Sequence, residues 1–358
     1  MQGSPIDIVI FAPLAAILGV LLFWFIQLLF IQCEKYLLSI LKHKHESLVR
    51  FTNFLGILFQ TICHALGYTV TRSGISDVYL SVDYSKVAPK KEKKGMFEWI
   101  SNVFLFIGPF FIPAVLLLIF LFFLIHNGFE VTTPSQLLEI KYTFSGQIAT
   151  FGNSLYVFSN SFFTFLFNID LLHPAHFGFL ILMIFMGLGI RPSYFGEKKK
   201  EKVDMIYDLR NIWQLVSNKP VYPILLFLIA YVFFYISFYL DQIWYVALFS
   251  ILGWLSIISI TSVFIANLLL LLVKNADEIT GRLRYLPYIT IPLIYVLMRL
   301  LFYYFPSDYT NSVSLLVTIL VTCLVVFLLL RKKTNKFKTK KRIKLFKKEK
   351  EKNEEEER

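Results

Sequence analysis

The chain has 358 residues, of which 56% are hydrophobic and only 17% are charged. This balance is far more apolar than one soluble core requires, so it excludes an ordinary soluble domain. Of the net charge of +12, residues 331–358 carry +8, so the charge belongs to a tail and no nucleic-acid partner is predicted.

Seven apolar runs are long enough to cross a bilayer, whose hydrocarbon needs roughly 20 helical residues. In chain order they are residues 6–32, 97–125, 171–190, 223–240, 243–273, 285–305 and 313–330. Residues 51–70 form an eighth candidate that polar residues interrupt, and residues 151–167 are more polar still and predict an interfacial or re-entrant piece. The pattern predicts an all-α, polytopic transmembrane helical bundle of seven to eight spans.

Two local patterns interrupt this series of helices. Residues 77–84 (DVYLSVDY) alternate apolar and polar side chains, which predicts a small β element at the membrane face. Paired prolines inside two apolar runs, Pro109 with Pro113 and Pro287 with Pro292, predict bends in those helices.

Lysine and arginine next to the spans predict the orientation. They gather in residues 71–96, 191–219 and the tail, whereas residues 127–170 hold only Lys141 and residues 306–311 hold none. We therefore expect an integral protein of the cell membrane, with a cytoplasmic C-terminus and residues 127–170 outside. The basic tail is expected to contact anionic lipid headgroups beside the bilayer.

One stretch of the eighth candidate helix carries a motif-like pattern. Residues 61–67 (TICHALG), followed by Tyr68, resemble the helix of site-2 proteases, intramembrane zinc metalloproteases in which His-Glu-x-x-His holds the metal. His64 stands at the first ligand position. Ala65 replaces the glutamate that would activate water, and Tyr68 replaces the second histidine. The resemblance therefore implies a core without catalytic residues.

Two later segments extend the same resemblance. Residues 107–109 (Ile-Gly-Pro) look like the Ala-Gly-Pro helix of that family, and residues 168–178 (NIDLLHPAHFG) are similar to its Asn…Pro-x-x-Asp-Gly segment. The residues expected around the former substrate groove are His64, Gly108, Pro109, Asn168, His173, Pro174 and His176. His64 and His176 are expected to face one polar pocket.

A metal is not expected in that groove, although zinc is conceivable. The candidate ligands are His64, His173 and His176, and two or three imidazoles with no catalytic base make a poor hydrolytic site. Structural roles for these histidines are the preferred interpretation, so no cofactor is predicted.

The sequence divides into an anchor helix with an interfacial amphipathic segment (1–50), a site-2-protease-like core (51–220), a four-helix membrane region (221–330) and the charged tail (331–358). The favoured function is a non-catalytic scaffold, or pseudoenzyme, that binds transmembrane helices of other proteins. A transporter or channel is the alternative, in which Arg299, Asn168 and Asp170 line a solute path; a divergent zinc metalloprotease is the third. As an intramembrane charge, Arg299 is otherwise expected to reach the outer interface.

Overall fold

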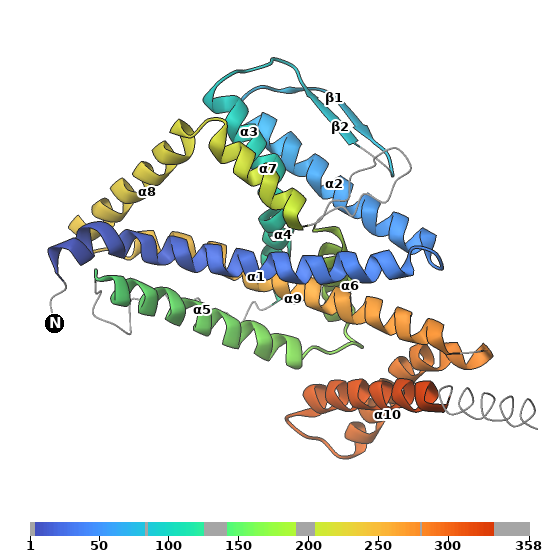
Figure 1. Cartoon of the computed structure of the whole chain (residues 1–358). Coiled ribbons are helices and arrows are strands. Elements are labelled where there is room, and N and C mark those ends of the chain that lie inside the picture. The colour runs from blue at the N-terminus through green and yellow to red at the C-terminus, as the bar shows by residue number, and fades with distance from the viewer. Residues whose placement is uncertain (1–3, 83–84, 125–141, 191–204, 280, 333–358) are drawn as a thin grey trace, which may run out of the picture. The chain divides into compact units, whose positions relative to one another are not determined.

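The computed structural model describes residues 4–82, 85–124, 142–190, 205–279 and 281–332. Residues 333–358, which hold nearly all of the basic tail with its expected lipid contact, and the connections at 127–141 and 191–204 lie outside the described residues. In chain order the elements are η1 Asp7–Phe11, α1 Ala12–Leu41, α2 Glu46–Val70, β1 Ile75–Leu80, β2 Ser85–Pro89, α3 Met96–Phe106, α4 Gly108–Leu124, α5 Phe144–Phe167, α6 Pro174–Gly189, α7 Met205–Ser217, α8 Val221–Tyr239, α9 Trp244–Glu278, η3 Gly281–Tyr285, α10 Leu286–Tyr304 and a last helix, Thr310–Lys332 (Figure 1).

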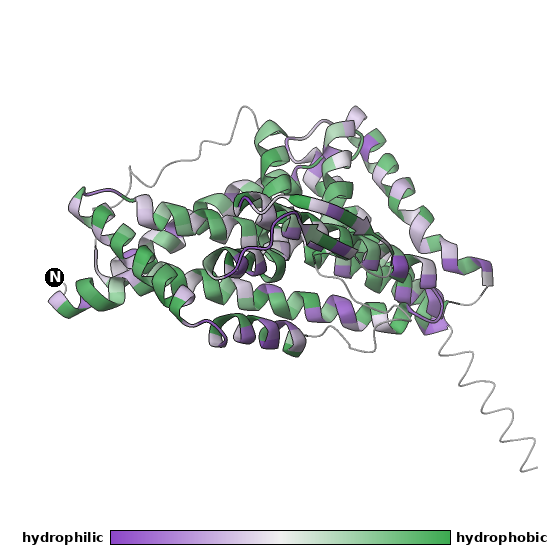
Figure 2. Ribbon diagram, turned by 90° about the horizontal axis from the view of Figure 1, so that it is seen from above, coloured by the Kyte–Doolittle hydropathy of each residue, from purple (hydrophilic) through white to green (hydrophobic). Residues whose placement is uncertain are grey.

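The predicted all-α membrane bundle with a small sheet is confirmed. Five helices are long and apolar enough to cross a bilayer: Asp7–Leu41, Val221–Tyr239, Trp244–Glu278, Gly281–Tyr304 and Thr310–Lys332. The pair α3 and α4 adds a sixth if it forms one span bent by 66°. Along the helices, hydrophobic residues predominate, while hydrophilic residues gather on connections and helix ends (Figure 2).

The described part of the chain thus holds fewer candidate spans than the seven to eight expected. The run at 171–190 forms only the 16-residue helix α6, because the chain turns between Asp170 and His173 and the helix begins at Pro174. The run at 51–70 lies in the 25-residue helix α2, whose polar residues keep its mean hydropathy below that of the candidate spans.

The predicted β element is a two-stranded antiparallel hairpin. The first strand begins at Ile75, two residues before the predicted stretch, and Val78 pairs with Val87 of the second strand. Gly74 has a φ of 67° between α2 and this strand, a conformation that glycine adopts without strain, so it redirects the chain into the hairpin.

Two compact units make up the chain: Met1–Leu166 with Asp170–Leu268, and Phe167–Ile169 with Leu269–Arg358. In the first unit, α1, α4, α6 and α9 meet around five buried side chains, Leu28, Ile31, Phe110, Ile190 and Val263. These residues come from segments far apart in the sequence, so the core depends on the assembled bundle.

Helix α5 is longer than the interfacial piece expected at residues 151–167. It spans 24 residues and runs beside α1 (Figure 1). The Asp7 carboxylate accepts a hydrogen bond from the Phe144 backbone N–H, and Phe151 packs on Gly19. Phe158 also stacks on Trp254 of α9 at 5.1 Å between ring centroids, so α5 belongs to the bundle.

Small residues allow other helices of this unit to approach closely. A Cβ added at Gly187 of α6 would lie 2.2 Å from the Ser262 carbonyl oxygen of α9, and one added at Gly189 would lie 2.4 Å from Phe59 of α2. Such glycine contacts are typical of membrane bundles, where close packing takes the place of a hydrophobic driving force.

The second unit contains its own polar cluster. The Arg299 side chain of α10 donates a hydrogen bond to the Asn311 side chain, and Asn311 donates to the Asn168 backbone carbonyl at 3.1 Å. Ser312 donates to the Asn168 side-chain oxygen at 2.7 Å. Arg299 therefore reaches the start of the last helix, Thr310–Lys332, instead of pointing to the middle of α10.

Candidate functional site

A broken helix lies at the centre of the first unit. The backbone changes direction at Ile107, between α3 and α4, and the two helices make an angle of 66°. Pro109 lacks a backbone N–H and cannot continue the hydrogen-bond pattern of α3, and Pro113 removes one hydrogen bond from the first turns of α4. The bend predicted from these prolines is confirmed, and broken helices in membrane bundles often mark functional positions.

Gln27 of α1 is directed at this broken region. The side chain is fully buried, and its Nε2 donates to the Phe110 carbonyl at 2.9 Å and to Ser259 Oγ of α9 at 2.6 Å. One carboxamide therefore ties three helices together, and α4 is held at its first turn.

Two polar atoms around this carboxamide have no hydrogen-bond partner within the described chain. They are the Gln27 Oε1, an acceptor, and the Trp24 Nε1, a donor, and both are buried. The Trp24 ring also meets the Phe110 ring edge-on at 5.8 Å. Unpaired buried groups are costly, so this place can take a small polar group or water.

The segment around His64 packs against the same broken helix. A Cβ added at Gly108 would lie 3.1 Å from the Cys63 Cβ, and one added at Gly67 would lie 2.9 Å from the Phe104 Cβ. Two of the three segments singled out in the sequence, residues 61–68 and 107–109, are thus in contact. The next residue after Gly108, Pro109, is buried.

His64 itself lies against Tyr68, one helical turn further along α2. The ring centroids of His64 and Tyr68 are 4.4 Å apart. Burial lowers the pKa of His64, so this half-buried imidazole is neutral at pH 7. Its neighbour is an aromatic ring and not a second metal ligand.

His176 lies in a different local cluster, at the start of α6. Its ring is 4.7 Å from that of His173 and 5.5 Å from that of Phe165, and its Nδ1 accepts a hydrogen bond from the Asp170 backbone N–H at 3.2 Å. Burial and the neighbouring His173 lower the pKa of His176, while Asp170 opposes them. Because Nδ1 accepts this hydrogen bond, the neutral ring carries its proton on Nε2.

The expected shared pocket of His64 and His176 does not form from these neighbours. Helices α2 and α6 meet where Phe51 contacts Phe185 and where Gly189 faces Phe59, whereas His176 is nine residues before Phe185. Within the described ranges no group of three His, Cys, Asp or Glu side chains could hold a metal ion. The groove candidate Pro174 is exposed, and no atom lies within 4 Å of a Cβ added at Gly178 of the same helix.

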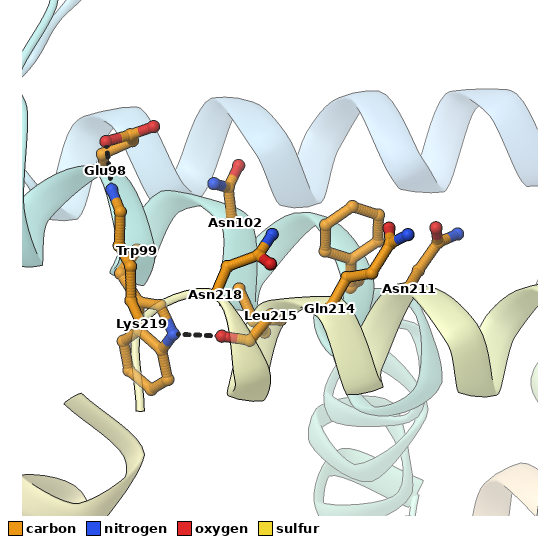
Figure 3. Close-up of a pocket in the computed structure, with 9 residues that line it drawn as sticks. Glu98, Trp99, Asn102, Asn211, Gln214, Leu215, Asn218 and Lys219 are labelled. Atoms are coloured by element: carbon orange, nitrogen blue, oxygen red, sulfur yellow. Dashed lines mark hydrogen bonds and ion pairs between the residues drawn. The ribbon is translucent and has the colours of Figure 1, made fainter. Parts of the chain in front are cut away.

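The structure also contains a pocket that the sequence did not predict, between α3 and α7 (Figure 3). Its volume is about 190 Å³. It is lined by Glu98, Trp99, Asn102, Phe106, Asn211, Gln214, Leu215, Asn218 and Lys219. The missed signal was the spacing of carboxamides at 211, 214 and 218, which places three of them on one face of a helix.

Two contacts fix the walls of this α3–α7 pocket. The Trp99 Nε1 donates to the Leu215 carbonyl at 3.0 Å, and Lys219 pairs with Glu98 at 2.6 Å (Figure 3). At the other end of the row of lining residues, beyond Gln214, the Asn211 Nδ2 is buried and has no partner within the described chain (Figure 3). The pocket is therefore formed by packed elements and retains one unused hydrogen-bond donor.

Comparison of the chain with protein-family models, with curated proteins and with solved structures found no match to any of the three.

Proposed function

We propose that this multi-pass membrane protein is a non-catalytic scaffold with a site-2-protease-like core that binds transmembrane helices of other proteins. The observation that carries the proposal is the exposure of α8. Six consecutive side chains, residues 224–229, are exposed and all are apolar. Because six consecutive helical residues point in every direction around the axis, no side of this part of α8 is buried against the described residues.

Both ends of α8 are nevertheless attached to the unit. Tyr231 and Tyr235 donate hydrogen bonds to the Ile10 and Val9 carbonyls of η1, while Tyr222 near the other end packs against Trp99. Helices α8 and α1 meet at one end and diverge from there (Figure 1). A helix held at its ends but bare in the middle can pair with an incoming apolar helix along its length.

Helix α1 also has an exposed apolar face. Leu18, Leu21, Leu22, Phe25 and Leu29 are exposed, and their spacing places them on one stripe of the helix. Van der Waals packing between such apolar surfaces is the main source of helix association in a bilayer. Lipid is the competing occupant of this surface. Saturable binding of a helix is therefore what would distinguish this region from any other lipid-facing surface.

The contact between residues 61–68 and the α3–α4 break supports the protease-like core. With Ala65 at the position of the general base and Tyr68 packed on His64, the chain offers no side chain to activate a metal-bound water there. Binding without cleavage is therefore the proposed activity.

The test is site-specific photo-crosslinking in nanodiscs. A diazirine amino acid is placed at Leu226 of α8 and, as a control of similar exposure, at Leu300 of α10; their exposures are 58% and 55%. A synthetic alanine–leucine transmembrane helix is then titrated. We expect saturable crosslinking at Leu226, none above background at Leu300, and no shortening of the peptide. Equal labelling at both positions would refute the proposal.

The transporter alternative is supported by the unpaired Gln27 Oε1 and Trp24 Nε1 beside the broken helix. Flux of small polar solutes into proteoliposomes distinguishes it, because Gln27→Leu would then reduce flux whereas Leu226→Ala would not. A divergent metalloprotease would instead be indicated by stoichiometric zinc after purification without added metal.

A further inference from the structure

The α3–α7 pocket lies where two membrane segments begin. Trp99 and Asn102 belong to the first turns of α3, and the residues from α7 lie just before α8, which begins at Val221. Both α8 and the α3–α4 pair are candidate spans, so their starting ends lie near the level of the lipid headgroups. The pocket is thus at a membrane interface.

Helix α7 has the pattern of a helix that rests on this interface. Ile206, Leu209, Trp213 and Val216 are exposed, and their spacing places them on one stripe. On its other side the helix carries the carboxamides of the pocket. An exposed apolar stripe next to a polar pocket suits a lipid, whose acyl chains and headgroup need both surfaces.

The charges around the pocket select against an ionic headgroup. Glu98 and Lys219 lie at its rim and neutralise one another through a contact of 2.6 Å. The remaining polar side chains that line the pocket, Asn102, Asn211, Gln214 and Asn218, are uncharged carboxamides. Such a lining provides hydrogen bonds but little attraction for an isolated phosphate or ammonium group.

Carboxamides and hydroxyl groups complement one another. Each carboxamide both donates and accepts hydrogen bonds, and so does each hydroxyl of a sugar. The buried Asn211 Nδ2 needs an acceptor oxygen, and the aromatic rings of Trp99 and Phe106 line the same space. A volume of about 190 Å³ corresponds to roughly six waters of ~30 Å³, which is room for one compact polar ring.

We propose that the α3–α7 pocket binds the uncharged sugar headgroup of a membrane glycolipid, with Asn211 donating to a hydroxyl oxygen. The sugar ring lies against the aromatic wall, and Gln214 and Asn218 hydrogen-bond its outer hydroxyls. The acyl chains then follow the apolar stripe of α7. This site is separate from the helix-binding surface, and neither proposal requires the other.

The test measures lipid retention by the full chain in nanodiscs of phosphatidylcholine. Monoglycosyl diacylglycerol, phosphatidylglycerol or phosphatidylethanolamine is added at equal mole fraction, and retained lipid is counted by native mass spectrometry together with the melting temperature. We expect one glycolipid per chain, retained at least tenfold above the other two lipids, and a higher melting temperature with glycolipid alone.

Variants and a soluble sugar complete the test. Asn211→Ala and the exposed Gln214→Ala should each reduce glycolipid retention several-fold, whereas Ser217→Ala, on the same helix outside the pocket lining, should leave it unchanged. Retention of phosphatidylglycerol or phosphatidylethanolamine equal to that of glycolipid overturns the proposal. Equal binding of free methyl glycoside overturns the assignment to a lipid.

Discussion

The buried ion pair between α1 and α7 gives the sharpest test of the packing. Lys35 Nζ lies 3.3 Å from Asp208 Oδ2, and their side chains are 8% and 1% exposed. Asp208→Asn keeps the side-chain size but leaves the buried Lys35 without this counter-charge. Breaking a buried pair in this way costs about 3–5 kcal/mol, because the remaining charge stays desolvated. At about 2–4 °C per kcal/mol, the melting temperature should fall by about 6–20 °C.

Thermal unfolding in nanodiscs, followed by size-exclusion chromatography, measures this loss. The double variant Lys35→Met with Asp208→Leu should recover most of it, since apolar replacement of a buried pair is often neutral or stabilising. The control is Glu98→Gln, because the Glu98–Lys219 pair is 48% and 40% exposed and should contribute under about 1 kcal/mol. If Asp208→Asn costs no more than Glu98→Gln, the Lys35 pair is hydrated and the reasoning fails.

Two further predictions concern close packing and topology. Gly187→Ala should destabilise the protein by about 1–3 kcal/mol, because the added Cβ would lie 2.2 Å from the Ser262 carbonyl oxygen. Gly178→Ala is the control and should be neutral or stabilising, since no atom lies within 4 Å of its added Cβ. Equal melting temperatures of the two variants would exclude the close approach of α6 to α9. A reporter fused after Arg358 should be cytoplasmic and one within residues 128–145 external, and an external signal at Arg358 would reverse the orientation.

Uninterrupted apolar runs predicted the helices well because their length alone decides whether they can cross a bilayer. The run at 223–240 became α8, Val221–Tyr239, within two residues at each end. The run at 6–32 was predicted to end too early. Helix α1 continues to Leu41 because Glu34 and Lys35, which look like a polar end, are buried in the bundle, where Lys35 has Asp208 as its partner.

The candidate site was only partly accessible from the sequence. Residues 61–68 and 107–109 lie on neighbouring helices of one bundle and are in contact, whereas the family resemblance that singled them out stays a prediction. His64 and His176 acquired different neighbours, since a helix's direction depends on packing that no local motif specifies. The α3–α7 pocket was missed because it combines a helix before one span with the start of another, more than 100 residues away.

Replacing Gln27 tests whether its buried carboxamide stabilises the bundle. Its Nε2 makes two hydrogen bonds to other helices, each worth on average ~0.6 kcal/mol in a membrane bundle, so together they contribute about 1 kcal/mol. Its buried Oε1 has no partner in the described chain, which costs about 1–3 kcal/mol. The apolar substitution Gln27→Leu is therefore expected to leave the melting temperature unchanged or to raise it. Ser259→Ala should lower the free energy of unfolding by less than about 1 kcal/mol, because the bond to Phe110 remains.

A loss above about 2 kcal/mol in Gln27→Leu would contradict this balance and would mean that the Oε1 atom is satisfied by a bound water. If the variant is as stable as the native chain but loses either helix crosslinking at Leu226 or solute flux, then the carboxamide serves function and does not add stability. In that outcome the two unpaired atoms, Gln27 Oε1 and Trp24 Nε1, are the groups that a partner helix or a solute satisfies.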